Sequence, residues 1–192
     1  MAKRRVVVTG MGAVSPNGIG REAFWAATLA GQSGVKAISR FETEGFAVRI
    51  AGEVQGFDED RYVAAKDRPH VSRATPLAVA ATAEALADAG LEPERMSRDE
   101  LRRIGVITGS GGASWEFTEE QYRLYYAGLG KQCSVYVVPT STPGTLASEV
   151  SMRFGLRGPI FASIIATKSS NGISPSNMLT LPMCIVASFF SK

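Results

Sequence analysis

Cysteine and histidine side chains are the first candidates for catalysis, because a cysteine thiolate activated by a histidine can attack a thioester. The chain has two cysteines, Cys133 and Cys184, and a single histidine, His70. Cys133 lies between Gln132 and Ser134 in a predicted loop, with no histidine or helix N-terminus beside it in the sequence to activate the thiol. His70 lies in a polar turn, which is typical of a surface or capping histidine. We therefore expect neither Cys133 nor His70 to be catalytic.

Two glycine-rich turns follow apolar runs and could approach a ligand with their backbone. The first, GMGAVS at 10–15, resembles a dinucleotide-binding loop, but Ser15 replaces the third glycine and no helix starts at once. Nucleotide binding is therefore an alternative that the pattern disfavours. The second, TGSGG at 108–112, lacks the Gly-Lys-Ser/Thr of a phosphate loop. It fits either close packing of helix and strand or a backbone kept clear for a ligand chain.

The elements that would position these groups alternate between strands and helices, which favours an α/β layered fold. The periodicity of apolar residues and the positions of turn residues predict strands or extended runs at 5–9, 46–54, 103–110, 135–138 and 160–166. They predict helices at 21–30, 58–66, 72–89 and 114–129, and one that begins at Pro143 and stops at Gly155. The strongest is 72–89, for which Ser72 is the expected cap and Gly90 the end.

Length and composition bound the remaining possibilities. The chain has 192 residues, of which 45% are hydrophobic and 20% charged, and this is ordinary for a globular protein. No apolar run approaches the roughly 18 residues of a membrane span, and two cysteines do not make a disulfide framework, so we expect a cytoplasmic protein without membrane contact. A net charge of +3 gives a weak positive field that would suit an acidic protein partner; we expect no nucleic-acid binding.

Four segments, in order and with matching spacing, resemble the β-ketoacyl-acyl-carrier-protein synthases, and most closely the type II elongation condensing enzymes of fatty-acid and polyketide synthesis. The segments are RRVVVTGMGAVSPNG at 4–18, FWAATLAGQSGV at 24–35, RIGVITGSGG at 103–112 and PTSTPGTLASEVSMRFGLRGP at 139–159. The resemblance implies the first half of a thiolase-like fold, with a mixed central sheet and packed helices. It also implies an acyl carrier protein as partner and a homodimer, without a cofactor or a metal.

The reaction that the resemblance implies is a decarboxylative condensation of acyl and malonyl thioesters by a cysteine nucleophile and two histidines. Here the expected nucleophile position falls at Thr167 or Lys168, and neither residue can form the acyl thioester as a cysteine does. One histidine in the whole chain cannot supply a pair. The resemblance therefore assigns no catalytic residue to this chain.

Other expectations follow from the same alignment. Gly112 falls at a position that lines the family's acyl pocket, and Tyr136, Val137 and Val138 fall in the segment that reaches the pocket across the dimer. We expect an N-terminal synthase domain over 1–166 and a divergent tail over 167–192. The loss of pattern after Pro159 suggests a truncated or frameshifted chain that is inactive on its own. The alternative is a non-catalytic module that pairs with a full-length synthase or binds carrier protein.

Overall fold

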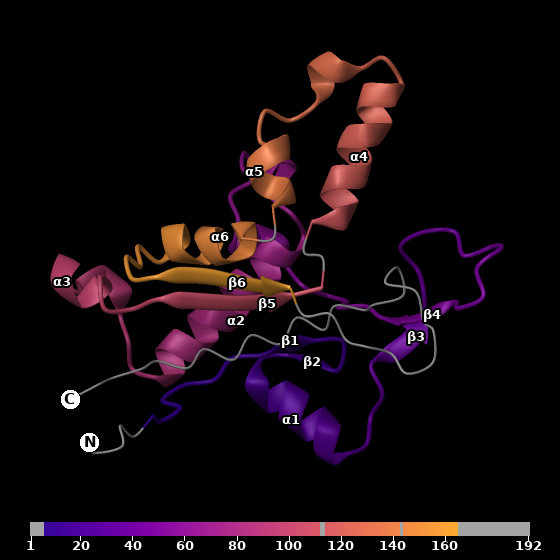
Figure 1. Cartoon of the computed structure of the whole chain (residues 1–192). Helices are drawn as coiled ribbons and strands as arrows, with labels where there is room; N and C mark the ends of the chain where they lie inside the picture. Colours follow the sequence, from indigo (N-terminus) through magenta and orange to yellow (C-terminus); the bar gives the residue numbers. More distant parts are fainter. Residues whose placement is uncertain (1–5, 112–113, 143, 165–192) are drawn as a thin grey trace.

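The structure is a computed structural model and describes residues 6–111, 114–142 and 144–164. Helices alternate with short strands in a mixed α/β arrangement (Figure 1). The helices are α1 (Arg21–Leu29), α2 (Ala74–Asp88), α3 (Arg98–Leu101), α4 (Trp115–Tyr126), α5 (Val137–Ser141) and α6 (Thr145–Arg153). The strands are β1 (Val14–Ser15), β2 (Gly18–Ile19), β3 (Val35–Ala37), β4 (Ile50–Gly52), β5 (Val106–Ser110) and β6 (Ile160–Ile164). Short 3-10 turns cover Glu59–Arg61, Arg68–His70, Pro93–Arg95 and Gly130–Gln132.

The strands of the described residues form three pairs. β1 with β2 and β3 with β4 are antiparallel, and β5 with β6 is parallel, in a register that runs from Val106 opposite Ile160 to Ser110 opposite Ile164. A parallel pair needs a long crossover, and here α4, α5 and α6 supply it. The carboxyl ends of β5 and β6 therefore lie side by side.

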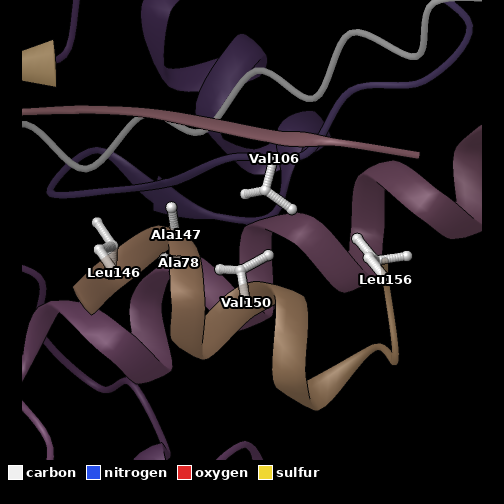
Figure 2. Close-up of a cluster of buried hydrophobic side chains, with 6 residues drawn as sticks. All are labelled: Ala78, Val106, Leu146, Ala147, Val150 and Leu156. Carbon is white, nitrogen blue, oxygen red and sulfur yellow. The ribbon is translucent and has the colours of Figure 1, made fainter. Parts of the chain in front are cut away.

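The core lies between α2, α6 and one face of β5. Ala147 of α6 is 0% exposed and Ala78 of α2 is 2% exposed, and these small side chains let the two helices approach each other closely. Figure 2 shows the side chain of Val106 directed from β5 toward both helices. The buried cluster comprises Ala78, Val106, Leu146, Ala147, Val150 and Leu156.

Helix α2 is buried around most of its circumference, because a second apolar cluster packs against it. That cluster joins Leu77, Ala80 and Ala81 of the helix to Val14 and Val54. The sequence predicts this helix correctly, and Gly90 ends it with a φ of 67°. The expected cap is wrong: Arg73 occupies the N-cap position and makes no side-chain capping bond, while Ser72 is 2% exposed.

The predicted buried strand at 5–9 is wrong over the residues that the structure describes. Val6, Val7 and Val8 belong to no strand and are 61%, 51% and 59% exposed. β-branched residues favour extended backbone, but a strand also needs a neighbour to accept its hydrogen bonds. Within the described ranges, none of the three strand pairs includes Val6, Val7 or Val8.

Three further boundaries differ from the sequence prediction. The strand expected at 46–54 shrinks to β4, and the helix expected at 58–66 shrinks to the turn Glu59–Arg61, in which the Asp58 carboxylate accepts the N–H of Asp60 at 3.1 Å. Helix α6 begins at Thr145 rather than at Pro143, and Pro143 lies outside the described residues.

Candidate functional site

The parallel pair β5–β6 leads to two of the positions that the sequence singles out. Gly112 follows the end of β5 at Ser110, and Thr167 and Lys168 follow the end of β6 at Ile164. All three residues lie outside the described part of the chain. The strands that precede them end next to each other, and the carboxyl edge of parallel strands is where α/β proteins commonly bind ligands.

Tyr136, Val137 and Val138 lie at the start of α5, so the extended run predicted at 135–138 is wrong. The Ser134 hydroxyl accepts the N–H of Tyr136 at 3.2 Å, and the N–H of Thr140 then bonds to the Tyr136 carbonyl at 2.9 Å. This local hydroxyl bond turns the chain into a helix despite its β-branched residues. Val138 is 75% exposed and Tyr136 is 49% exposed, whereas Val137 is half-buried.

His70 connects α5 to the rest of the molecule. Its Nδ1 lies 3.0 Å from the Ser134 Oγ, and its carbonyl accepts the Thr140 hydroxyl at 2.8 Å. Its ring centroid lies 5.0 Å from that of Tyr136. Since Ser134 also accepts a backbone N–H, its own proton can be donated to Nδ1. The sequence correctly places His70 in a turn, and its contacts here are those of a residue that fixes a loop.

Two hollows of about 650 and 680 Å³ flank His70, one on the side of Cys133 and one on the side of Tyr136. Several charges along the first are paired: Glu59 accepts from Arg68 and Arg73, and Glu116 accepts the backbone N–H of Arg73 at 2.8 Å. The second hollow carries the Glu149–Arg153 ion pair and several threonine hydroxyls. Neither presents a free cluster of charge for a strongly ionic ligand.

The thiol of Cys133 is half-buried and donates weakly to the Gln121 carbonyl, at 3.6 Å from Sγ to oxygen. This contact occupies the thiol proton. Cys184 lies outside the described residues. In the ranges that the structure covers, no three His, Cys, Asp or Glu side chains gather as a metal would need, and no helix is long and apolar enough to cross a membrane.

The glycine loop at 10–15 is packed against α2. A Cβ on Gly10 would lie 2.1 Å from the Ala85 carbonyl oxygen, and one on Gly12 would lie 2.0 Å from that of Ala81. Real Cβ atoms never come so close to a backbone oxygen, so only glycine allows this loop to touch the helix.

The loop is also fastened by two carboxylates of α2, Glu84 and Asp88. Glu84 accepts the N–H of Ala13 at 2.9 Å and that of Arg21 at 2.8 Å, and Asp88 accepts the N–H of Met11 at 3.0 Å. That N–H and the Arg21 side chain lower the pKa of the Asp88 carboxyl. These N–H groups are therefore not free to hold a phosphate, which excludes the dinucleotide alternative for this loop.

Sequence reasoning missed two of these features, the His70–Ser134 contact and the carboxylate pair Glu84 and Asp88. The bond between His70 and Ser134 joins residues 64 positions apart and has no local pattern. Glu84 and Asp88 had a usable signal, since two carboxylates four residues apart on an alanine-rich helix face the same way.

Comparison with known families and proteins gives one consistent result. Residues 3–173 match the family described as "Beta-ketoacyl synthase, N-terminal domain". The chain is 39% identical over 168 residues to the tetracenomycin polyketide synthase ketoacyl synthase beta subunit of Streptomyces glaucescens. It is 39% identical over 173 residues to 3-oxoacyl-acyl-carrier-protein synthase 2 of Vibrio cholerae.

The fold agrees with the sequence match. The solved structure described as the ishigamide ketosynthase/chain length factor is similar to 85% of this chain, with a TM-score of 0.69 and 30% identity. The two sequence matches include 88% and 90% of this chain. They include only 40% and 41% of the lengths of the two relatives. It therefore corresponds to the N-terminal two-fifths of such proteins, in the first half of a thiolase-like fold, as the sequence predicts.

Proposed function

Because the chain belongs to the β-ketoacyl synthase family, we propose that it is a ketosynthase-type polypeptide of fatty-acid or polyketide synthesis that has no condensing activity on its own. The reaction of its family, implied by the resemblance, joins acyl and malonyl thioesters with loss of CO2. The thiolate must carry the acyl chain, and paired imidazoles must assist decarboxylation and hold the enolate oxygen.

One observation carries the proposal: the chain has a single histidine, and that histidine holds a loop. The His70 imidazole lies against the Ser134 hydroxyl, and the His70 backbone carbonyl accepts the Thr140 hydroxyl, so this residue joins α5 to the turn Arg68–His70. The expected nucleophile positions, Thr167 and Lys168, supply no thiol. Both parts of the catalytic machinery are therefore lacking within this sequence.

The test is an assay of the purified chain with acyl and radiolabelled malonyl carrier protein. We expect no β-ketoacyl product above a protein-free blank, while a full-length 3-oxoacyl synthase assayed alongside gives product. Thr167→Cys and Lys168→Cys should each remain inactive, because a thiol alone cannot replace the missing imidazoles. Turnover by the unmodified chain would overturn the proposal.

A second function, a non-catalytic module that pairs with a full-length synthase, is favoured by the outer face of α4. Tyr122, Tyr125 and Tyr126 are 59%, 65% and 80% exposed and contact one another, with centroid distances of 6.3 and 5.5 Å. Exposed aromatic clusters are typical of protein–protein interfaces, where they supply most of the binding energy.

Sedimentation of this chain with a full-length ketosynthase tests the pairing. We expect a mixed complex that is lost in the double variant Tyr125→Ser, Tyr126→Ser. Glu22→Ser on α1 is the matched surface control. A parallel titration with acyl carrier protein tests the other proposed partner. If neither protein binds the unmodified chain, the module function is wrong.

The site and domain assignments belong to the same proposal. Gly112 would line an acyl pocket, and Tyr136, Val137 and Val138 would reach the pocket of a second chain. The outward position of Val138 at the start of α5 supports a contact between chains. The synthase domain would extend over 1–166, with the divergent tail over 167–192.

A further inference from the structure

Ser134 and His70 form a contact of the kind that joins the nucleophile and the base of a serine hydrolase. The Ser134 Oγ lies 3.0 Å from the His70 Nδ1 and accepts the Tyr136 N–H at 3.2 Å. Nδ1 accepts a hydrogen bond when the neutral ring carries its proton on Nε2, so the Ser134 hydroxyl can donate to it. An imidazole bonded to a serine in this way can take the hydroxyl proton while the oxygen attacks a carbonyl carbon.

Both side chains are accessible to a small molecule. They are half-buried, and both line the hollow of about 650 Å³ that lies between α4 and residues 68–73. This volume is within the range of small-molecule sites in proteins. Val71, Phe117 and Leu124 give the hollow an apolar lining. The hollow therefore suits an uncharged acyl group beside the Ser134 hydroxyl.

The imidazole is held in place by neighbouring groups. The His70 carbonyl accepts the Thr140 hydroxyl at 2.8 Å, and the His70 ring centroid lies 5.0 Å from that of Tyr136. A base that is already positioned needs no reordering before it takes a proton, which lowers the barrier to the reaction. The contacts that fix the loop therefore also orient the imidazole toward Ser134.

Gln121 brings an amide group next to the same serine. Its side chain is 9% exposed, lines the same hollow, and accepts the Ser134 N–H at 2.7 Å through Oε1. The amide nitrogen of Gln121 carries two N–H groups. Side-chain amides can stabilise the oxyanion that forms when a carbonyl is attacked. Gln121 is therefore the candidate donor to that negative charge.

Cys133 also lines the hollow, but it is the weaker candidate for the nucleophile. Its thiol donates to the backbone carbonyl of Gln121 at 3.6 Å, and an amide carbonyl is not a general base. Ser134 bonds instead to an imidazole, which is the side chain that most often acts as one. The geometry thus favours the serine over the cysteine.

We propose that Ser134 is a nucleophile, that His70 is its general base, and that this hollow hydrolyses small uncharged acyl esters. The Ser134 Oγ attacks the carbonyl carbon while the His70 Nδ1 takes the hydroxyl proton. When the bond from the carbonyl carbon to the leaving oxygen breaks, His70 gives this proton to the leaving alcohol, and an acyl ester remains on Ser134. Water then attacks the acyl ester and gives a proton to His70. The bond to Oγ breaks, Oγ takes that proton, and the carboxylic acid leaves.

This activity goes beyond the proposed function. Ester hydrolysis needs one imidazole beside the nucleophile, whereas the condensation implied by the family resemblance needs a thiolate and a pair of imidazoles. The chain can therefore lack condensing activity and still cleave esters, so the two proposals fail separately.

Hydrolysis of p-nitrophenyl acetate by the full chain tests the proposal. We expect p-nitrophenolate release that falls at least about 100-fold in Ser134→Ala and in His70→Gln, since general base catalysis contributes about 100- to 10,000-fold in rate. Ser134→Ala retains His70, so it also measures the cleavage that an imidazole causes without the serine. Ser97→Ala is the matched control, because the Ser97 hydroxyl bonds to Glu100 at 2.7 Å and lies outside both hollows. Circular dichroism confirms that each variant is folded.

A covalent probe provides a second readout, which the unmodified chain supplies directly. A fluorophosphonate forms a phosphonate ester with an activated serine and releases fluoride. We expect its adduct on Ser134, within the tryptic peptide 132–153, where tandem mass spectrometry can locate it. His70→Gln should reduce the rate of labelling about 100-fold.

Three results would overturn the proposal. One is hydrolysis by the unmodified chain that does not exceed hydrolysis by Ser134→Ala. Another is the absence of a probe adduct from Ser134. The third is labelling of Ser134 at an unchanged rate after His70→Gln, which would show that the imidazole does not activate the hydroxyl.

Discussion

The body around α2 and α6 and the arm formed by residues 114–142 are held in opposite ways. The body encloses two apolar clusters, and ten of the fifteen residues of α2 are buried. The arm, which Figure 1 shows extending away from the β5–β6 pair, buries only Phe117 and Gln121 within α4. Many of its other contacts are hydrogen bonds, such as that from the Ser134 N–H to the Gln121 side chain at 2.7 Å.

This difference separates two kinds of stability. Apolar burial holds the body together as one cooperative unit. Hydrogen bonds contribute only about 1 kcal/mol each in net terms, so the arm should open at a lower free energy than the body. A partner that binds the exposed tyrosines would act on the less stable region.

The largest effect should come from a charge placed in the body. Val150 is 3% exposed in the cluster of Figure 2, and Val150→Asp leaves an unpaired carboxylate there, which should cost about 3–5 kcal/mol of unfolding free energy. Urea titration followed by circular dichroism measures the loss. The matched variant Tyr126→Asp in the arm should change stability by no more than about 0.5 kcal/mol. Equal losses would contradict the distinction between body and arm.

The next effect tests how closely the glycine loop contacts α2. Gly12→Ala introduces a Cβ beside the Ala81 carbonyl, which forces loop and helix apart and should cost about 2–3 kcal/mol. Gly144→Ala is the control, because a Cβ there meets nothing within 4 Å. Thermal unfolding of both variants measures the difference in stability. A Gly12→Ala variant as stable as the parent chain would show that the loop is not held tightly against α2.

A smaller and local effect is expected in the arm. Ser134→Ala removes the hydroxyl that meets His70 and starts α5, and should loosen the arm by about 1 kcal/mol without unfolding the body. Trypsin cleavage after Lys131 should then become about fivefold faster. Ser148→Ala removes a hydroxyl that bonds to the Gly144 carbonyl just before α6, and it should leave that rate unchanged. If both variants cleave alike, the Ser134 contact does not hold the arm.

The smallest effect concerns pH. The Met11 N–H and the Arg21 side chain lower the pKa of Asp88, so its contribution to stability is present above the carboxyl's ordinary value of about 4. It is lost as the pH falls through the lowered value, when the folded protein takes up the proton. Asp88→Asn should therefore reduce the melting temperature at neutral pH, and the gap to the parent chain should close in acid. A gap that is independent of pH would contradict this assignment.

Local chemistry was enough to predict much of the body. Gly90 and Gly155 end α2 and α6 with positive φ, as glycine after a helix predicts. The prediction of a strand at 5–9 was wrong because strand propensity does not show whether a neighbouring strand exists. The prediction of an extended run at 135–138 was wrong because the hydrogen bond of the Ser134 hydroxyl outweighed the β preference of three valines.

The candidate site was less predictable than the fold. His70 and Ser134 meet only because the crossover through α4 brings α5 back over the turn Arg68–His70. No periodicity in the sequence reports such a contact. The family resemblance did correctly indicate the N-terminal ketosynthase fold, while Gly112, Thr167 and Lys168 stay predictions.

The carboxylates of α2 have a consequence for exchange with solvent. The amide hydrogens of Met11 and Ala13 in the loop, and of Arg21 at the first residue of α1, are each bonded to Glu84 or Asp88. Deuterium can replace them only when these bonds open. We therefore expect the amide hydrogens of the loop to exchange as slowly as those of α2. A segment with the sequence of a turn would then show the hydrogen-exchange protection of a helix.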